Sequence, residues 1–210
     1  MKLLKKYINQ YKSKIKKGKV IVISAPSGAG KTTVCKELLK RNKDIVFSVS
    51  YTTREKRSCE VDGKDYYFVS EKKFFQMVKQ NKFIEWAKVH NHFYGTPKDF
   101  VIKTINSSKN ILLDIDVQGG KNIRKIFPEG IFIFILPPSV EALKKRIISR
   151  GEDDVNEINT RLENVDKELK YISFYDYIVI NDKLEETVKI IENIISANKY
   201  KIKIENRVKK

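Results

Sequence analysis

Short apolar runs alternate along the chain with stretches in which apolar residues recur every three to four positions. The apolar runs are typical of buried parallel strands and cover residues 19–24, 45–51, 110–115, 131–136 and 177–180. Helical spacing predicts helices over residues 3–16, 31–41, 97–106, 118–127, 140–150, 155–170 and 183–199. This alternation predicts an α/β fold in which helices flank both faces of a parallel sheet.

Two segments interrupt the alternation. Residues 52–95 contain short aromatic strands at 66–69 and 83–88 around one helix, and residues 150–160 are polar and acidic between two helices. Ligands of open α/β sheets bind at one edge, where loops and insertions gather. We therefore expect both segments to be insertions at the ligand-binding edge.

Composition narrows the class of protein. The 210 residues favour one domain, and 41% of them are hydrophobic, which is enough for a core. No apolar run approaches the roughly 18 residues that a membrane span needs, and the charged N-terminus lacks the features of a signal peptide. Cys35 and Cys59 form neither a disulfide framework nor a metal-type spacing. These features predict a cytoplasmic protein with no membrane partner.

The net charge of +17, from 43 basic and 26 acidic residues, raises a nucleic-acid partner as an alternative. The lysines are spread along the chain, however, and do not form one stripe with interleaved aromatics. We interpret the charge as compositional bias and do not expect a nucleic-acid partner. A positive field would also favour polyanionic nucleotide substrates.

A glycine-rich segment follows the first apolar run and opens the next predicted helix. This strand–loop–helix context is what a phosphate-binding P-loop requires, although Ala25 replaces the first glycine of the general pattern. Lys31 would reach the β- and γ-phosphates of a nucleoside triphosphate, and the Thr32 hydroxyl would bind Mg²⁺. The predicted ATP-binding residues are Ala25, Pro26, Ser27, Gly28, Ala29, Gly30, Lys31, Thr32 and Thr33.

A second cluster suits a phosphate monoester, and so indicates the acceptor of the phosphoryl group. Arg54 and Arg57 lie three residues apart beside hydroxyl-bearing side chains, and Tyr66 follows them. Guanidinium groups bind such an oxyanion through paired hydrogen bonds, and phenol hydroxyls can fill the remaining positions. Farther along, Glu85 and residues 93–96 supply a carboxylate and further hydroxyls on short strands.

Several segments together resemble the successive signatures of guanylate kinases, in the order and spacing of that family. They are Phe47-Ser-Val-Ser-Tyr-Thr-Thr-Arg54, Glu60-Val-Asp-Gly63, Phe83-Ile-Glu-Trp86, Tyr94-Gly95 and Leu113-Asp-Ile-Asp-Val-Gln-Gly119. The resemblance implies an enzyme of purine nucleotide metabolism that transfers the γ-phosphoryl group of ATP to GMP, with Mg²⁺ as cofactor. It also implies a P-loop NTPase-type parallel sheet flanked by helices, an inserted α+β subdomain that binds GMP, and a lid.

The resemblance assigns residues to GMP. Glu85 would accept hydrogen bonds from guanine N1–H and the exocyclic amino group. Adenine offers neither donor, and each unmade buried bond costs roughly 1–3 kcal/mol. Ser50 and Thr96 would add hydroxyl contacts to the base. The implied GMP-binding residues are Ser50, Arg54, Arg57, Tyr66, Glu85, Tyr94, Thr96 and Asp116.

Two carboxylates and several arginines complete the implied site. Asp114 and Asp116 follow an apolar run and would face the same way on a strand. The resemblance places Asp114 beside the P-loop and Asp116 near GMP, with both near the water shell of the metal. Capping of a helix is the alternative role for Asp116. Asn181 would contact adenine, and the implied catalytic residues are Lys31, Arg54, Arg146, Arg150 and Arg161, the last three on the lid.

The predicted organisation is one kinase domain between two basic extensions. Its parts are an N-terminal helical extension (1–18), a domain over 19–200 with core segments 19–49, 97–139 and 169–200, a GMP-binding subdomain (50–96), a lid (140–168), and a C-terminal tail (201–210). The extensions have no counterpart in the family pattern. Cys59 replaces a glycine of that pattern, and a positive φ there would strain it.

Three alternatives remain open from sequence alone. A guanylate-kinase-like interaction module shares the resemblance, although Gly30-Lys31-Thr32 is intact here and argues against it. A P-loop kinase with another acceptor shares the donor site, although Glu85 argues for guanine. The third is the nucleic-acid binder considered above, and both a monomer and a homo-oligomer fit the sequence.

Overall fold

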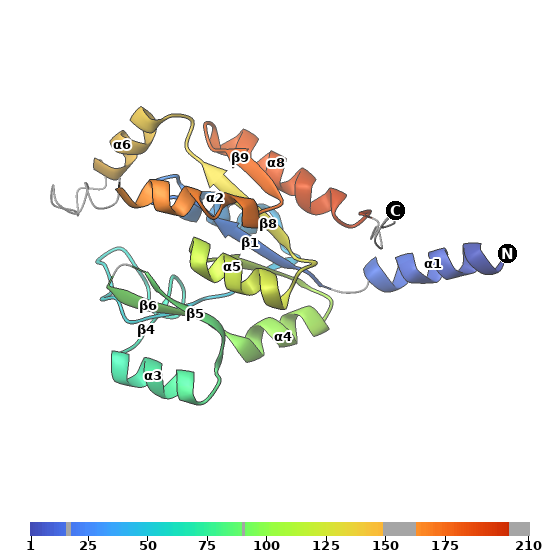
Figure 1. Cartoon of the computed structure of the whole chain (residues 1–210), viewed down its shortest axis with the longest axis horizontal. Coiled ribbons are helices and arrows are strands. Elements are labelled where there is room, and N and C mark those ends of the chain that lie inside the picture. The colour runs from blue at the N-terminus through green and yellow to red at the C-terminus, as the bar shows by residue number, and fades with distance from the viewer. Residues whose placement is uncertain (16–17, 90, 149–162, 202–210) are drawn as a thin grey trace, which may run out of the picture.

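The computed structural model describes residues 1–15, 18–89, 91–148 and 163–201 (Figure 1). Its centre is a five-stranded parallel sheet in the order β2-β7-β1-β8-β9. The strands are β1 (Val20–Ser24), β2 (Ile45–Phe47), β7 (Asn110–Asp114), β8 (Ile131–Leu136) and β9 (Tyr177–Ile180). Every residue of β1 is buried, because helices cover both faces of the sheet, and this explains why the strand is a continuous apolar run.

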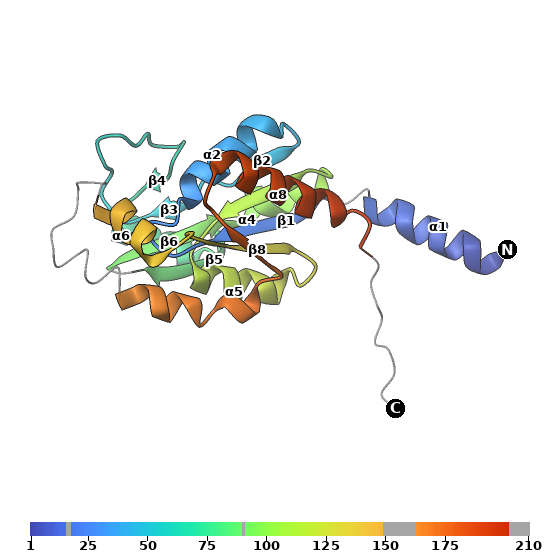
Figure 2. The same cartoon turned by 90° about the horizontal axis from the view of Figure 1, so that it is seen from above.

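Helices form a layer on each face of this sheet (Figure 2). On one face, α2 (Lys31–Arg41) and α8 (Leu184–Ala197) pack Leu38 and Ile191 against Ile21 and Ile23 of β1. On the other face, α4 (Lys98–Asn106) and α5 (Val117–Ile126) contribute to a cluster that includes Val22. Because alternate residues of β1 join opposite clusters, one strand anchors both layers. The predicted α/β class is confirmed.

A smaller four-stranded sheet in the order β4-β3-β6-β5 lies beside the core. It is formed by β3 (Tyr51–Thr52), β4 (Tyr67–Phe68), β5 (Phe83–Val89) and β6 (His92–Pro97). Helix α3 (Glu71–Lys79) packs against it through Phe74, whose ring stacks on Phe83 with centroids 4.7 Å apart. These elements span residues 51–97 and so extend the predicted insertion (52–95) by one residue at its start and two at its end.

The prediction of one strand over residues 45–51 is wrong in detail, because the chain changes sheets within that run. Phe47 pairs with Leu112 of the core sheet, whereas Tyr51 pairs with Gly95 of the smaller sheet. Between them, Ser48 N–H donates to the Leu112 carbonyl and the Ser50 carbonyl accepts from Tyr67 N–H. An apolar run therefore shows that both parts are buried, without showing that they share a sheet.

Helix α6 (Val140–Ile148) and helical residues 163–169 lie where two helices of the lid were predicted. The segment between them, including Arg150 and Arg161, lies outside the described residues, as does the tail from residue 202. Within the described part of the chain, no helix has the length and apolar character needed to cross a membrane.

Candidate nucleotide-binding site

The P-loop connects the carboxyl end of β1 to the first turn of α2. Gly28 and Gly30 have φ angles of 86° and 90°, in the left-handed region that favours glycine. A Cβ on Gly30 would lie 2.4 Å from Asn181 Nδ2. Glycine is therefore required at Gly30 both by its backbone angle and by the close approach of a neighbour. The resulting loop leaves the N-terminus of α2 available for an anion.

Two residues expected to act on ATP support the P-loop backbone. Asn181 Nδ2 donates to the Ala29 carbonyl at 2.7 Å, and Thr187 Oγ1 donates to Asn181 Oδ1 at 3.2 Å. Arg146 from α6 donates to the Ala29 carbonyl at 3.4 Å and to the Asn181 carbonyl at 3.1 Å. In this conformation both side chains therefore hold the loop that would hold the phosphates.

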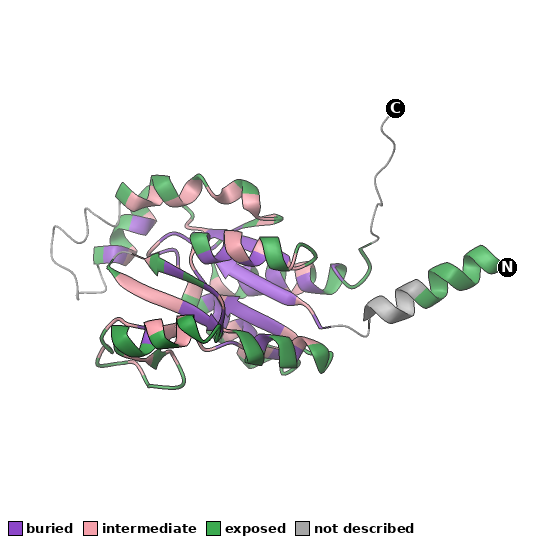
Figure 3. Ribbon diagram, turned by 60° about the horizontal axis from the view of Figure 1, so that its bottom comes forward, coloured by how far each residue is buried: buried purple, intermediate pink, exposed green. Residues whose placement is uncertain are grey.

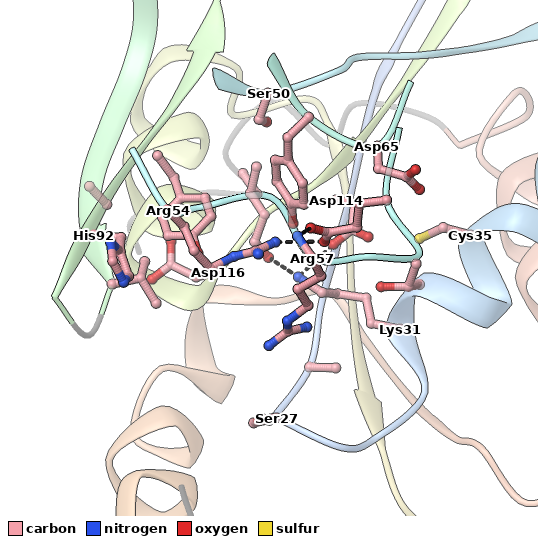
Figure 4. A pocket seen from close by; sticks show the side chains of 18 of the residues that line it. Ser27, Lys31, Cys35, Ser50, Arg54, Arg57, Asp65, His92, Asp114 and Asp116 are labelled. Carbon is pink, nitrogen blue, oxygen red and sulfur yellow. Dashed lines mark hydrogen bonds and ion pairs between the residues drawn. The ribbon is translucent and has the colours of Figure 1, made fainter. Parts of the chain in front are cut away.

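Lys31 and Asp114 form the charged pair at the base of the P-loop (Figure 4). Lys31 Nζ lies 2.6 Å from Asp114 Oδ1 and donates to the Ile115 carbonyl at 3.0 Å. Burial alone would lower the pKa of Lys31, but the Asp114 carboxylate raises it above its ordinary value. The ammonium group therefore stays charged at every physiological pH.

Asp116 caps α5, which was the alternative role considered for it. Its Oδ1 accepts from Gly119 N–H at 3.0 Å and its Oδ2 from Gln118 N–H at 3.1 Å. The side chain nevertheless lines the same cavity as Asp114. Capping and ligand binding are therefore compatible for this residue, because the cap fixes the carboxylate at the rim of the cavity.

Arg54 and Arg57 are organised by Glu60, a residue that the sequence analysis did not place in the site. Glu60 Oε1 accepts from Arg54 Nη2 at 2.6 Å, and its Oε2 accepts from the backbone N–H of Arg57 at 2.9 Å. Burial alone would raise the pKa of Glu60, but these hydrogen bonds lower it. The Arg54 guanidinium also lies 5.6 Å from the centre of the Tyr66 ring. A fixed carboxylate thus orients the cationic end of the cavity.

Glu85 is a buried acid on β5. The alternation of the strand places it on the same face as the buried Phe83 and Ala87, and only 8% of its surface is exposed. Thr96 Oγ1 donates to Glu85 Oε1 at 2.6 Å. Burial, with a smaller contribution from the negative charge of Asp116, raises the pKa of Glu85 to about 7, although the Thr96 hydrogen bond acts in the opposite direction.

One cavity of about 1130 Å³ joins these groups. It reaches from the P-loop, across the edge of the core sheet, to the smaller sheet. Its expected residues are Ala25, Pro26, Ser27, Gly28, Gly30, Lys31, Thr32, Ser50, Arg54, Arg57, Tyr66, Glu85, Tyr94, Asp114 and Asp116. Thr96 lies behind Glu85, as its hydrogen bond shows, and the described lining does not include Ala29, Thr33, Arg146 or Asn181.

Comparison with known proteins identifies the family. The guanylate kinase family model matches residues 17–198. The chain belongs to the guanylate kinase family. A guanylate kinase of Caldanaerobacter subterraneus subsp. tengcongensis is 49% identical over 187 residues, which cover 89% of this chain and 91% of that protein. A guanylate kinase of Clostridium tetani is 50% identical over 188 residues, which cover 90% of each.

A solved structure supports the same family assignment. The crystal structure of guanylate kinase from Anaplasma phagocytophilum superposes with a TM-score of 0.75 and 35% sequence identity, covering 89% of this chain and 88% of that one. The P-loop NTPase-type sheet implied by the resemblance to guanylate kinases is thereby confirmed.

The departure at Cys59 from the guanylate kinase pattern is tolerated without backbone strain. Among the described residues other than glycine, a positive φ occurs only at Asn81 and Ser108. Cys59 is exposed and lies within a turn in which Glu60 N–H donates to the Arg57 carbonyl. Cys59 therefore does not have the positive φ that would strain the acceptor loop.

Glu168 is a cavity residue that the sequence analysis missed. It comes from helical residues 163–169 and lines the cavity near Ser27 of the P-loop. Burial raises its pKa to about 7, although a hydrogen bond from Ser27 N–H opposes the shift. Helical periodicity alone does not distinguish such a residue from a solvated acid on the same helix, so the sequence offered no signal for it.

The donors at the P-loop fit a magnesium ion bound together with a nucleotide. Thr32, Asp114 and Asp116 line the same cavity. Their hydroxyl and carboxylate oxygens are the kind of ligand that Mg²⁺ prefers. The described residues contain no group of three or more His, Cys, Asp or Glu that could hold a metal by itself. This donor set suits an ion that keeps several waters and contacts substrate phosphates.

Proposed function

We propose that the chain transfers the γ-phosphoryl group of ATP to GMP, with both nucleotides held in one cavity. The observation that carries this proposal is that Lys31 and Glu85 line that cavity together. Lys31 belongs to the phosphate-binding loop, and Glu85 is a buried acceptor on the other sheet. The family to which the chain belongs has the same activity, an ATP:GMP phosphotransferase.

On the acceptor side, Glu85 reads the base and the arginines hold the phosphate. An ionised Glu85 accepts from guanine N1–H and the amino group, while Ser50 and Thr96 supply hydroxyls. Thr96 already donates to Glu85 Oε1, so it orients the carboxylate toward the base. Arg54, Arg57, Tyr66 and Tyr94 hold the GMP phosphate, and Asp116 lies at the boundary between acceptor and donor.

On the donor side, the P-loop backbone and Lys31 bind the phosphates of ATP. Thr32 would hold Mg²⁺ directly, with Asp114 and Asp116 acting through water. The bound ion would neutralise charge on the β- and γ-phosphate oxygens. Lys31 serves the same purpose from the protein, because its ion pair with Asp114 places the ammonium group at the base of the loop.

In the reaction, an oxygen of the GMP phosphate attacks the γ-phosphorus in line. One phosphorus–oxygen bond forms between GMP and the γ-phosphorus. The bond from the γ-phosphorus to the β,γ-bridging oxygen breaks, and ADP leaves with that oxygen. A phosphate oxygen is already ionised at neutral pH, so no general base is needed. Lys31 and Arg54 stabilise the charge of the transferring group, since such catalysis consists largely of positioning and electrostatic stabilisation.

The remaining roles concern the lid and the cell. Arg146, Arg150 and Arg161 would approach the phosphates when the lid closes over ATP, which for Arg146 requires exchanging its contact with the Ala29 carbonyl. Asn181 would contact adenine beside the P-loop, where its side chain donates to the Ala29 carbonyl. The two cysteines are free, which supports a reducing compartment, and we place the enzyme in the cytoplasm in GMP recycling.

A coupled assay of ADP release tests the proposal, with Mg-ATP and GMP, AMP, CMP or UMP offered separately. We expect turnover with GMP alone and its loss in Lys31→Ala. Lys40→Ala is a matched control, because Lys40 lies on the exposed side of the same helix, where it pairs with Glu37, and is not among the residues that line the cavity. If AMP or a pyrimidine nucleotide proves as good a substrate as GMP, the role of Glu85 is refuted. If no monophosphate is phosphorylated although ATP binds, the interaction-module alternative replaces the proposal.

A further inference from the structure

Helix α1 (Lys2–Ile15) precedes the segment that the guanylate kinase family shares. The family match begins at residue 17, and the helix extends away from the body of the protein in both views (Figures 1 and 2). All side chains of residues 1–9 are exposed (Figure 3). Within the helix, four of them are large and apolar, namely Leu3, Leu4, Tyr7 and Ile8, with exposed fractions of 64%, 58%, 58% and 42%. Catalysis in the family therefore does not account for this helix.

The apolar residues form one face of the helix. Leu3 and Tyr7 are four residues apart, as are Leu4 and Ile8, so these pairs are neighbours on the helix surface. Residues 1–17 also contain seven lysines and no aspartate or glutamate. This segment thus combines an apolar stripe with charged residues that are all cationic. An isolated helix of this length is marginal in water, so a partner that covers the stripe would stabilise it.

We propose that α1 is an interfacial anchor that lies in the surface of a lipid bilayer with anionic headgroups. Basic amphipathic helices bury their apolar face at the boundary between headgroups and acyl chains, and anionic lipids attract their lysines. This surface complements both faces of α1 at once. The helix lies on the membrane and does not cross it, so no membrane-spanning segment is required. The proposal differs from the sequence-based expectation that the protein has no membrane partner.

Other partners complement only one face of the helix. If two copies paired through their apolar stripes, the lysine-rich flanks would meet with no acidic residue to balance them. A nucleic acid would attract the lysines through its phosphates, but it would leave Leu4 and Ile8 in water. The combination of four exposed large apolar residues with unopposed lysines therefore favours the bilayer.

The position of α1 is compatible with catalysis. The chain enters β1 at Val20 and leaves it at Ser24 for the P-loop, so α1 and the cavity lie at opposite ends of the same strand. A protein anchored through α1 would keep the cavity open to nucleotides. The anchor and the kinase activity are thus separable by mutation.

Cosedimentation of the full chain with lipid vesicles tests the anchor. We expect binding to vesicles of phosphatidylcholine mixed with phosphatidylglycerol, and little binding to phosphatidylcholine alone. The double variant Leu4→Ser/Ile8→Ser keeps every charge. Its affinity for the vesicles should fall at least about tenfold, since it removes apolar area from the interface. Asn9→Ser, opposite the stripe, is the matched control and should bind like the parent chain. Lys5→Gln/Lys6→Gln should weaken binding and flatten its dependence on salt.

GMP kinase activity of each variant shows that the domain is folded, because none of these residues belongs to the cavity. The anchor is refuted if the full chain ignores anionic vesicles, or if Leu4→Ser/Ile8→Ser binds them as well as Asn9→Ser does. It is also refuted if sedimentation velocity shows instead that the parent chain dimerises through α1. Salt-dependent binding to a random RNA oligonucleotide that survives Leu4→Ser/Ile8→Ser, without vesicle binding, would assign the lysines to nucleic acid.

Discussion

At the scale of single residues, burial shifts the titration of Glu85, the carboxylate that we propose binds guanine. Its pKa is raised to about 7 by burial in the protein without ligand, whereas guanine requires the ionised form. We therefore expect GMP binding to weaken about tenfold as the pH falls from about 8 to about 6. The inhibition constant of guanosine, measured across this range, isolates the base from the titrating phosphate of GMP. A constant that does not change with pH would contradict the assignment of the base to Glu85.

The same residue should lower the stability of the fold at alkaline pH. The pKa of Glu85 is higher in the folded protein than its ordinary value of 4.5, so between these values the folded state binds more protons than the unfolded state. Stability contributed by the protonated form is therefore lost as the pH rises toward 7. Glu85→Gln should raise the melting temperature at about pH 8 and much less at about pH 5, while GMP turnover falls. Thermal unfolding of both proteins at the two pH values measures this, and an equal shift at both would argue against it.

At the scale of elements, the P-loop depends on β9 and α8, which lie far from it in sequence. The Ala29 carbonyl accepts from Asn181, and Asn181 is held by Thr187 at the start of α8. We expect Asn181→Ala to loosen the loop and to raise KM for ATP about tenfold, with a smaller effect on KM for GMP. Steady-state kinetics with each substrate varied in turn measure the difference.

The control for this variant is Asn198→Ala. Asn198 is also buried, and it donates to Tyr177 Oη and the Ile194 carbonyl at the other end of α8. It should lower stability without a selective change in KM for ATP. If both variants change the two KM values alike, the effect of Asn181 is a general loss of fold and not a property of the P-loop.

The elements themselves were largely predictable because their signals are local. The P-loop combines glycines, a lysine and a strand–helix context within nine residues, and the predicted helix over 31–41 matches α2. Features that depend on tertiary contact were not predictable. Glu60 orients Arg54 and Arg57, Glu168 lines the cavity, and Asn181 supports the P-loop, and each role arises only when the chain is folded. The change of sheet within residues 45–51 belongs to the same class, because burial does not identify the neighbouring strand.

At the scale of the whole molecule, the net charge of +17 acts on substrates that are all anions. A protein field of one sign raises the local concentration of oppositely charged ligands, and salt screens this attraction over about 8–10 Å at ordinary ionic strength. Contacts within the cavity, such as Lys31 with Asp114, are shielded and respond less to salt. Charge should therefore affect the capture of substrates more than the chemical step.

We expect KM for GMP to rise several-fold as ionic strength increases from about 0.05 M to about 0.5 M, while kcat changes little. Guanosine provides the internal control, because it presents the same base to Glu85 without the phosphate. Its inhibition constant should stay nearly constant over the same range, so the difference between the two ligands isolates attraction to the phosphate. If guanosine and GMP weaken in parallel, salt acts on the base site or on the fold. In that case the positive field would have no part in substrate capture, and the excess of lysine would serve α1 and solubility alone.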